Sequence, residues 1–282
     1  MVKILKAGFY STIQDNGRFG YSSFGVPVSG AMDQKAYNFA NTILGNDKNS
    51  AVIEMTMVGA EIQFMVPTLV AITGANMTPK LNGIPIDMNT SIVVRVNDVL
   101  SCGIAKNGFR TYIAVKGGFL TDLVLGSRSM LKVVTEPFKL NNGDSIAITE
   151  SSKLQNIKNA KIRFNDGYLK TNCIKVTKGP EFYKLTHQQQ ESLLSQSFEV
   201  SKYNNRMAYQ LLPLFNNNLE SILTAPVLPG TVQLTPSGQL IVLMRDCQTT
   251  GGYPRVLQLT DHAVNILSQK MSGTQISIHL KI

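Results

Sequence analysis

Residues 239–259 read QLIVLMRDCQTTGGYPRVLQL, which places a polar turn between two apolar segments. Residues 239–244 have the length and branched apolar content of a buried strand, and residues 255–259 form a second apolar segment. The turn between them holds an acid, an amide, two hydroxyls and a Gly-Gly pair, which permits a tight turn or a close ligand approach. The stretch therefore predicts strand–turn–strand. Its polar groups form either a site or a β-turn in which Asp and Thr side chains bind local backbone groups.

Outward from this stretch, short segments of strand character separated by turn signals dominate the chain. Strands are expected at 60–65, 68–73, 91–96, 110–116, 145–149, 221–228, 231–234, 239–244, 255–259 and 275–281. Asn-Gly pairs, as at 82–83, have the residue types of tight hairpin turns. This spacing is typical of a β-barrel or sandwich and not of alternating βαβ units. We therefore predict a mainly β protein with a few helices.

Helices are predicted at 33–44, at about 187–196, and once more after Thr260. The first has apolar residues at i, i+3, i+4 and i+7, and Asp33 is suited to cap its start. The second opens with a capping box that begins at Thr186. Together with the strands, these patterns give each half of the chain strands and one or two helices.

The segment 7–33 is rich in glycine and shows little periodicity, so we expect a structured loop there. Asp15 and Arg18 lie three residues apart within it, a spacing that permits an ion pair that pins the loop. Residues 151–165 are polar and rich in lysine, which makes them the candidate linker. The length of 282 residues suits two domains on either side of this linker.

Composition excludes several classes of protein. The chain is 43% hydrophobic and 16% charged, and no apolar run approaches the roughly 20 residues of a membrane span. The start of the chain lacks the apolar core of a signal peptide, so a cytoplasmic protein is expected. The net charge is +9, but the basic residues are spread along the chain, so neither nucleic-acid nor membrane binding is predicted. The three cysteines and three histidines are scattered, which predicts no metal centre or disulfide framework.

Three ordered segments carry a family resemblance: TIQDNGRFGYSSFGVPVSGAMD at 12–33, SKYNNRM at 201–207, and LPGTVQ at 228–233 through QTTGGYP at 248–254. Together they resemble the biotin-dependent carboxyltransferase-like family, also called allophanate hydrolase subunit 2. The resemblance covers essentially the whole chain. It implies two cyclophilin-like β-barrel domains, which we place at 1–160 and 161–282, the second carrying the Asp-x-Gln-Thr-Thr-Gly-Gly-Tyr-Pro motif.

The resemblance implies three alternative functions. In stand-alone bacterial members the implied activity is ATP-dependent opening of 5-oxoproline to glutamate, as the C component of a complex with a KipI-like B component and an A component. In fused members the module is the carboxyltransferase of a biotin-dependent urea or amide carboxylase. A KipA-like member would instead bind and antagonise a KipI-like regulator without turnover. The chain has no Met-Lys biotin-attachment motif and no Walker A loop, so ATP or biotin would have to be handled with partner proteins.

The same resemblance implies site residues. The catalytic candidates are Asp246, Arg206 and Gln248, and the substrate-binding candidates are Gln14, Asp15, Arg18, Gln233, Thr249 and Tyr253. The family pattern usually has Gly where this chain has Ala208, which removes only the freedom to adopt positive φ there. Cys247 fills a variable position and is expected to be a bystander thiol.

Chemistry supports these residue types. Amide activation develops negative charge on oxygen, and Arg and Gln side chains are suitable fixed donors. Asp246, at the end of a predicted strand, could act as general base if it is partly desolvated. It could also accept hydrogen bonds from the Thr249 and Thr250 amides in an Asx-turn. A third alternative is an ion pair with a buried arginine, either Arg206 or Arg255.

Overall fold

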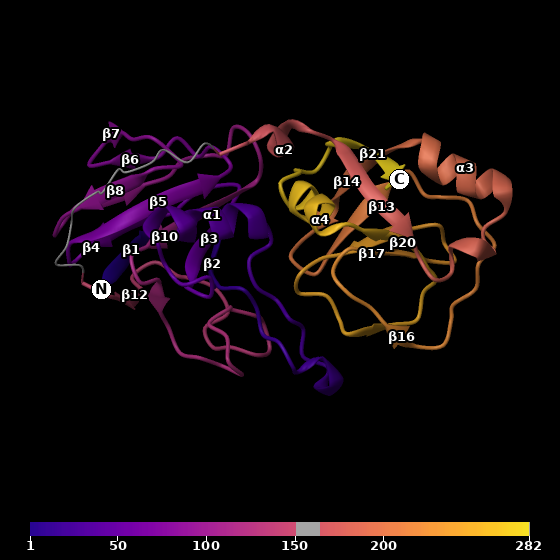
Figure 1. The fold of residues 1–282 in the computed structure, drawn as a ribbon, viewed down its shortest axis with the longest axis horizontal. Coiled ribbons are helices and arrows are strands. Elements are labelled where there is room, and N and C mark those ends of the chain that lie inside the picture. Colours follow the sequence, from indigo (N-terminus) through magenta and orange to yellow (C-terminus); the bar gives the residue numbers. More distant parts are fainter. Residues whose placement is uncertain (151–163, 282) are drawn as a thin grey trace. The chain divides into compact units, whose positions relative to one another are not determined.

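The computed structural model describes residues 1–150 and 164–281, which form two compact units. Unit 1 consists of Met1–Arg18 and Asp33–Lys170, and unit 2 consists of Phe19–Met32 and Thr171–Ile282 (Figure 1). The chain therefore passes from the first unit to the second, back to the first, and again to the second. The domain limits 1–160 and 161–282 stay a prediction, and most of the expected linker, 151–163, lies outside the described residues.

Unit 1 is built from two antiparallel sheets. The larger sheet has the order β11 (Phe119–Leu120), β12 (Ser145–Ile148), β1 (Val2–Lys6), β4 (Glu61–Phe64), β9 (Val99–Ser101), β6 (Lys80–Leu81) and β7 (Ile84–Pro85). The smaller sheet has the order β2 (Tyr10–Gln14), β3 (Val52–Thr56), β10 (Arg110–Val115), β5 (Thr68–Gly74) and β8 (Ser91–Val94). The expected hairpin turn at Asn82 and Gly83 joins β6 to β7, and both residues have positive φ.

One hydrophobic core joins the two sheets of unit 1. It includes Ile4 and Phe64 from the larger sheet and Ile53, Ile72 and Ile113 from the smaller one, all of them inaccessible to solvent. Side chains on a strand point alternately to its two faces, so each of these strands directs one apolar face toward this core. Burial of such side chains contributes about 1.5–3 kcal/mol each, which makes this cluster the main source of stability in the unit.

Helix α1 (Gln34–Leu44) packs against β5 and β10 in unit 1. Asp33 begins it as predicted: one carboxylate oxygen accepts hydrogen bonds from the backbone amides of Lys35 and Ala36, each at 3.1 Å. The other carboxylate oxygen accepts a 2.6 Å hydrogen bond from the hydroxyl of Tyr168, which lies in the short helix α2 (Gly167–Lys170). Asp33 therefore both caps α1 and fixes the residues around Tyr168 against it.

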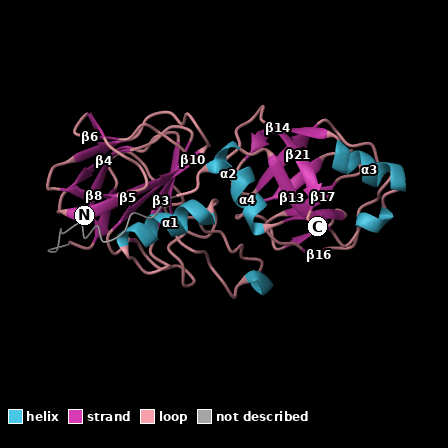
Figure 2. Cartoon of the chain, turned by 45° about the horizontal axis from the view of Figure 1, so that its top comes forward, coloured by secondary structure: helices cyan, strands magenta, loops and turns pink. Residues whose placement is uncertain are grey.

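Unit 2 is a closed barrel (Figure 2). Its order is β13 (Cys173–Lys178), β20 (Arg255–Leu259), β17 (Thr231–Leu234), β18 (Leu240–Leu243), β15 (Ala208–Leu212), β14 (Ser197–Asn204) and β21 (Gln275–Leu280). The pair β13–β21 is parallel and the other barrel pairs are antiparallel. A small ribbon pairs β16 (Ala225–Pro226) with β19 (Thr250–Gly251).

The helices of unit 2 lie outside the barrel. Helix α3 (His187–Ser195) packs against β21, and α4 (Asp261–Ser268) packs against β13 and β20. The predicted capping box at Thr186 and the cap at Thr260 are both present. Two short 3-10 helices, η1 (Ser22–Phe24) and η2 (Phe182–Lys184), complete the unit.

Three sequence-based expectations need correction. The segment 7–33 is not all loop, because it contains strand β2 and the 3-10 helix η1. The strand expected at 221–228 is reduced to Ala225–Pro226. The strands β1, β3, β9, β13, β14 and β15 and the two-residue strands β6, β7, β11 and β19 were not predicted. Strand β2 has Ser11, Thr12 and Gln14 buried on both faces, so it lacks the alternation of apolar and polar residues by which strands are recognised.

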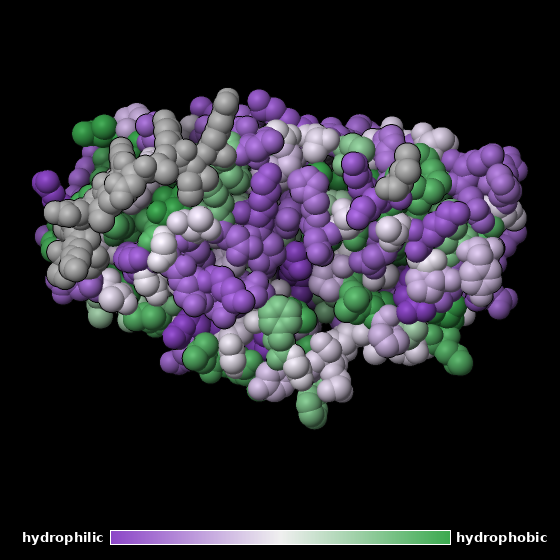
Figure 3. Space-filling model, in the orientation of Figure 1, coloured by the Kyte–Doolittle hydropathy of each residue, from purple (hydrophilic) through white to green (hydrophobic). Residues whose placement is uncertain are grey.

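The surface mixes hydrophilic and hydrophobic residues (Figure 3). On the face drawn in Figure 3, polar and charged residues are interspersed with apolar ones in both units. Among residues 1–150 and 164–281, no helix has the length and apolar character needed to cross a membrane. In the same ranges no group of three or more His, Cys, Asp or Glu side chains is arranged to hold a metal ion.

Candidate functional site

A buried ion pair joins two of the predicted catalytic residues in unit 2. The Arg206 guanidinium donates from Nε to Asp246 Oδ2 at 2.8 Å and from Nη2 to Asp246 Oδ1 at 2.9 Å. The side chains are only 6% and 11% exposed. Ser29 Oγ donates to Asp246 Oδ1 at 2.6 Å, and Arg206 Nη2 also donates to the Gly30 carbonyl at 2.7 Å. Both carboxylate oxygens of Asp246 are therefore engaged, and the geometry matches the third alternative, the pair with Arg206.

The ion pair joins three separate segments of unit 2. The backbone amide of Asp246 donates to the Arg206 carbonyl at 2.9 Å, and the Ser29 amide donates to the Arg245 carbonyl at 3.0 Å. The segment 19–32 is thus held to the loop after β18 and to the turn between β14 and β15. Bidentate arginine–carboxylate contacts fix orientation as well as distance. The pair consequently sets the positions of Asn205 and Gln248, its near neighbours in sequence.

A pocket of about 560 Å³ lies beside this ion pair in unit 2. Its volume is within the range of small-molecule sites. Four kinds of residue line it, namely carboxamides, tyrosines, apolar residues and one lysine: Asn204, Asn205, Gln210, Gln233, Gln248, Tyr203, Tyr253, Met207, Ala208, Ile241, Leu243 and Lys202. The predicted residues Gln233, Gln248 and Tyr253 are therefore brought together in one cavity.

The glycine-rich motif shapes the pocket through Gln233. This side chain is 1% exposed, and its Nε2 donates to the Tyr253 carbonyl at 3.5 Å, while its Oε1 accepts from Gln248 Nε2 at 3.4 Å. A Cβ at Gly251 would collide with Gln233 Nε2, so the motif requires glycine there because the Gln233 amide occupies the space. Gln248 Oε1 is buried and has no hydrogen-bond partner among the described residues, which makes it an acceptor available to a ligand.

The described hydrogen bond of Thr249 is made by its backbone. Its carbonyl accepts a 3.0 Å hydrogen bond from the Val227 amide, next to the β16–β19 ribbon. The ribbon holds the motif against residues 222–227. Thr249 is absent from the residues that line the pocket within the described part of unit 2. Its backbone hydrogen bond helps to fix the path of the motif, and its substrate-binding role stays a prediction.

The two departures from the family pattern have simple structural explanations. Ala208 is the first residue of strand β15 and packs with Val227, Leu243 and Cys247, so the position does not require glycine in this chain. The Cys247 thiol is buried, and burial together with the nearby Asp246 charge raises its pKa to about 12. A thiol with so high a pKa stays protonated near neutral pH and is a poor nucleophile.

A second ion pair, Glu181 with Arg255, supports the same part of the barrel. Arg255 donates to Glu181 from Nε at 2.9 Å, from Nη2 at 2.8 Å, and from its backbone amide at 2.8 Å. Arg255 Nη1 also donates to the Pro226 carbonyl at 3.0 Å, which ties β16 to the barrel. The hydrogen bonds from the Arg255 side chain hold the pKa of the Glu181 carboxyl below its usual range, although burial opposes this shift.

This lowered pKa predicts a pH-dependent contribution to stability. A carboxyl group whose pKa is lower in the folded than in the unfolded state stabilises the fold above its unfolded pKa, about 4.3 for Glu. The contribution disappears as pH falls from there through the lowered folded-state pKa. We therefore expect Glu181→Gln to lose free energy of unfolding at neutral pH and to approach the wild type below about pH 4. Urea unfolding of both proteins across this pH range measures the difference in their free energies of unfolding. A difference that does not change with pH would contradict the prediction.

The other predicted site residues lie in unit 1, where they hold the loop 124–131. The buried Asp15 carboxylate accepts hydrogen bonds from the Gly17 and Arg128 amides and from the Ser127 and Ser129 hydroxyls, at 2.6–2.9 Å. The side chain of Arg18 donates to the Val124 and Ser129 carbonyls, and that of Gln14 to the Met130 carbonyl. All three residues are at most 5% exposed, and these contacts hold the loop in place, while their substrate-binding role stays a prediction.

Sequence reasoning missed several residues of the unit 2 site. Ser29 and Gly30 lie within the segment that carries the family resemblance, but only the folded chain shows that they contact Asp246 and Arg206. Lys202 and Asn205 lie in the SKYNNRM segment, beside the predicted Arg206. Their position next to Arg206 in sequence is the one feature from which they could have been predicted. Gln210 lies on strand β15, which was not predicted, so no pattern pointed to it.

Comparison with known proteins adds independent information. Residues 24–280 match the family model described as carboxyltransferase domain, subdomain A and B. The chain is 32% identical to the 5-oxoprolinase C subunit of Escherichia coli K12 over 98% of this chain and 90% of that protein. It is 41% identical to urea amidolyase of Lachancea kluyveri over 45% of this chain and 7% of that protein.

The fold agrees with a solved structure. The crystal structure of Kluyveromyces lactis urea amidolyase is matched with a TM-score of 0.88 and 24% identity, over 98% of this chain. The chain spans only 18% of that much longer protein, so the likeness concerns the fold of one part of it. The family match covers nearly all of the chain, and the E. coli relative is matched along most of its own length. The chain therefore belongs to the carboxyltransferase domain family, subdomains A and B.

Proposed function

We propose that this chain is the C component of an ATP-dependent 5-oxoprolinase-type complex, in which it binds the lactam that is opened to glutamate. The observation that carries the proposal is the lining of the unit 2 pocket. Carboxamides supply both donors and acceptors, and Lys202 is the one charged residue among the described residues that line it. The similarity to the E. coli 5-oxoprolinase C subunit along 90% of that protein supports the same function.

The pocket chemistry suits a small cyclic amide that bears a carboxylate. The buried Gln248 Oε1 is an available acceptor for a lactam N–H. Asn205 Oδ1 accepts from the backbone amides of Met207 and Ala208, which leaves its side-chain N–H groups as donors for a carbonyl oxygen. Lys202 provides a positive charge for the carboxylate. A neutral substrate such as urea would make no use of that charge, so the lysine favours the oxoprolinase alternative.

Within this proposal the predicted catalytic residues have different roles. Gln233, Gln248 and Tyr253 contact the substrate, and fixed donors of this kind stabilise charge that develops on the amide oxygen. Arg206 and Asp246 act as positioning residues, because their ion pair is buried and holds the loops that carry Asn205 and Gln248. Bound ATP would supply the driving force for ring opening. Since the chain lacks a Walker A loop, we assign the nucleotide to a site completed by the KipI-like B component or by the A component.

A second candidate is the carboxyltransferase component of a biotin-dependent carboxylase. The observation that favours it is the 41% identity to a segment of a urea amidolyase. That activity would require a separate biotin carrier. The two candidates differ in the charge of the small substrate, so a test of Lys202 bears on both.

We expect Lys202→Met to raise the KM for 5-oxoproline about fivefold in the reconstituted complex, the effect of losing one partly exposed charge contact. The kcat should change little, because Lys202 contacts the carboxylate and not the reacting amide. Release of ADP and glutamate from 5-oxoproline by this chain with its A and B partner components measures both parameters. Absence of turnover with all three wild-type proteins present would reject the proposed function itself.

Lys178→Met provides the matched control. Lys178 Nζ lies 5.1 Å from the centroid of the Phe182 ring, and Lys202 Nζ lies 5.3 Å from that of Tyr203, so both lysines sit over an aromatic ring in unit 2. Lys178 does not line the pocket among the described residues. An equal rise in KM for both variants would show that the effect comes from net charge and not from the pocket.

A further inference from the structure

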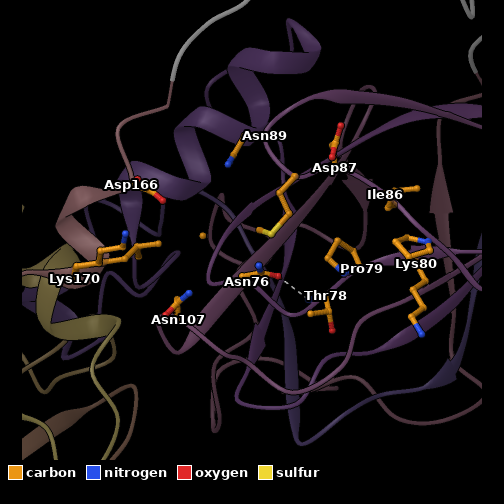
Figure 4. Close-up of a pocket in the computed structure, with 14 residues that line it drawn as sticks. Asn76, Thr78, Pro79, Lys80, Ile86, Asp87, Asn89, Asn107, Asp166 and Lys170 are labelled. Atoms are coloured by element: carbon orange, nitrogen blue, oxygen red, sulfur yellow. Dashed lines mark hydrogen bonds between the residues drawn. The ribbon is translucent and has the colours of Figure 1, made fainter.

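A second pocket, of about 500 Å³, lies in unit 1. It is formed by the loop after β5, the β6–β7 hairpin and the chain that follows it, the loop before β10, and helix α2 (Figure 4). None of the site residues predicted from the sequence lines it. Its volume is that of a cavity for a small organic molecule.

Three asparagine side chains point toward the same space in this pocket, those of Asn76, Asn89 and Asn107 (Figure 4). Asn76 Oδ1 accepts a 2.8 Å hydrogen bond from the Thr78 amide, which leaves the Asn76 side-chain N–H groups for another acceptor. Asn89 Oδ1 is buried and has no hydrogen-bond partner among the described residues. The cavity therefore presents carboxamide N–H donors, and the Asn89 carboxamide at its wall (Figure 4) has a buried oxygen, although buried polar groups normally have partners.

The charged residues of the lining do not define a site for an ion. Lys80 and Asp87 point away from the space that the asparagines face, and Asp166 and Lys170 lie at its edge (Figure 4). Two lysines and two aspartates leave the lining without net charge. A negatively or positively charged ligand would consequently gain little over a neutral one here.

Apolar residues complete the lining, among them Pro79, Ile86, Met88 and Leu169. Such residues can cover the faces of a flat ring while carboxamides bind the polar edge of the ring. Asn and Gln recognise nucleobases in this way, since one carboxamide donates to a ring acceptor and accepts from a neighbouring N–H. A carboxamide is equally complementary to the H–N–C=O edge of a lactam.

We propose that the unit 1 pocket binds a neutral ring compound through an edge that carries a hydrogen-bond donor next to an acceptor. Nucleosides and lactams are two sources of this chemistry. The cavity is large enough for a nucleoside, with the base against the asparagines. The site is separate from the unit 2 pocket, so the proposal is independent of the proposed function.

The test uses the full chain, labelled with nitrogen-15, and adenosine, uridine and 2-pyrrolidinone as probes. We expect the side-chain amide signals of Asn76 and Asn107 to shift on addition of at least one probe, with a dissociation constant of about 1 mM or tighter. Adenosine monophosphate should bind no more tightly than adenosine, because the lining carries no net charge. Binding of a nucleoside but not of 2-pyrrolidinone identifies the nucleoside as the source, and the reverse identifies the lactam.

The double variant Asn76→Asp/Asn107→Asp keeps the acceptor for the Thr78 amide and removes the side-chain N–H donors. Binding should weaken about tenfold or more, the scale of losing a paired contact to a base edge. Asn97→Asp is the control, since Asn97 is an exposed turn residue of the same unit outside the pocket. The proposal is overturned if no probe shifts the asparagine signals, or if the double variant, with an unchanged melting temperature, binds as well as the wild type.

Discussion

Asp246→Asn is expected to destabilise unit 2 by about 3–5 kcal/mol, because it removes one partner of a buried ion pair and leaves the Arg206 charge without its carboxylate. The loss is a large part of the roughly 5–15 kcal/mol that stabilises a typical domain. An asparagine of the same shape would also present an N–H group to Arg206 or Ser29, which are both donors toward Asp246. Urea unfolding and thermal melts measure the effect, and we expect the melting temperature to fall by about 10 °C.

The double variant Arg206→Met/Asp246→Leu separates the ion pair from a general-base role. Replacing both members of a buried pair by apolar residues is often neutral or stabilising, so we expect this variant to recover much of the lost stability. Asp261→Asn, an exposed residue in the first turn of α4, is the control and should change stability by less than about 1 kcal/mol. A fully stable Asp246→Asn variant that has lost turnover would instead assign Asp246 to catalysis and refute its positioning role.

The second large effect is expected for Asp15→Asn in unit 1, with a loss of about 2–4 kcal/mol. The Asp15 carboxylate accepts from two backbone amides and two hydroxyls, and the side chain is only 5% exposed. An asparagine has one acceptor oxygen, so at least one buried donor of the loop 124–131 would face an N–H group. Chemical denaturation of the variant tests this expectation.

Asp47→Asn is the matched control for Asp15→Asn. The Asp47 carboxylate accepts a 2.7 Å hydrogen bond from the Asn49 amide in an exposed turn of the same unit. Its replacement should change stability by no more than about 0.5 kcal/mol. If the two variants lost equal stability, the burial and the number of donors at Asp15 would not matter, and the structural role assigned to it would be wrong.

The helices could be predicted from the sequence because their signals are local. Asp33 and Thr186 bind backbone amides within three residues of themselves, so the residue types near each helix start are sufficient to identify it. Strand β2 could not be found in this way, since Thr12 and Gln14 are buried beside partners that lie far along the chain. The partner of Gln14, the Met130 carbonyl, is one such distant residue.

Prediction of the site was limited in the same way, because its contacts also join residues far apart in sequence. The motif around Asp246 could be singled out from its composition, but three roles for Asp246 remained open until its neighbours were known. In the structure Arg206 and Ser29 contact its carboxylate, and they lie 40 and 217 residues away in sequence. The resemblance grouped Gln14, Asp15 and Arg18 with the unit 2 residues as a substrate site. In the structure those three bind a loop of unit 1, while Gln233, Gln248 and Lys202 line the pocket of unit 2. The substrate-binding role of the first three stays a prediction.

The path of residues 19–32 has a consequence for how the protein is made. This segment leaves the ribosome before most of unit 1, yet its partners Arg206 and Asp246 are synthesised much later. Domains tend to fold in the order of synthesis, so unit 1 can complete its sheets before the barrel has been synthesised. During that time the segment, which carries the exposed Phe19 and Phe24, lacks its partners in the barrel. For the same reason no single cut of the polypeptide separates the units: a fragment that starts at Thr171 would lack Ser29 and Gly30 and would leave the Arg206–Asp246 pair partly open to water.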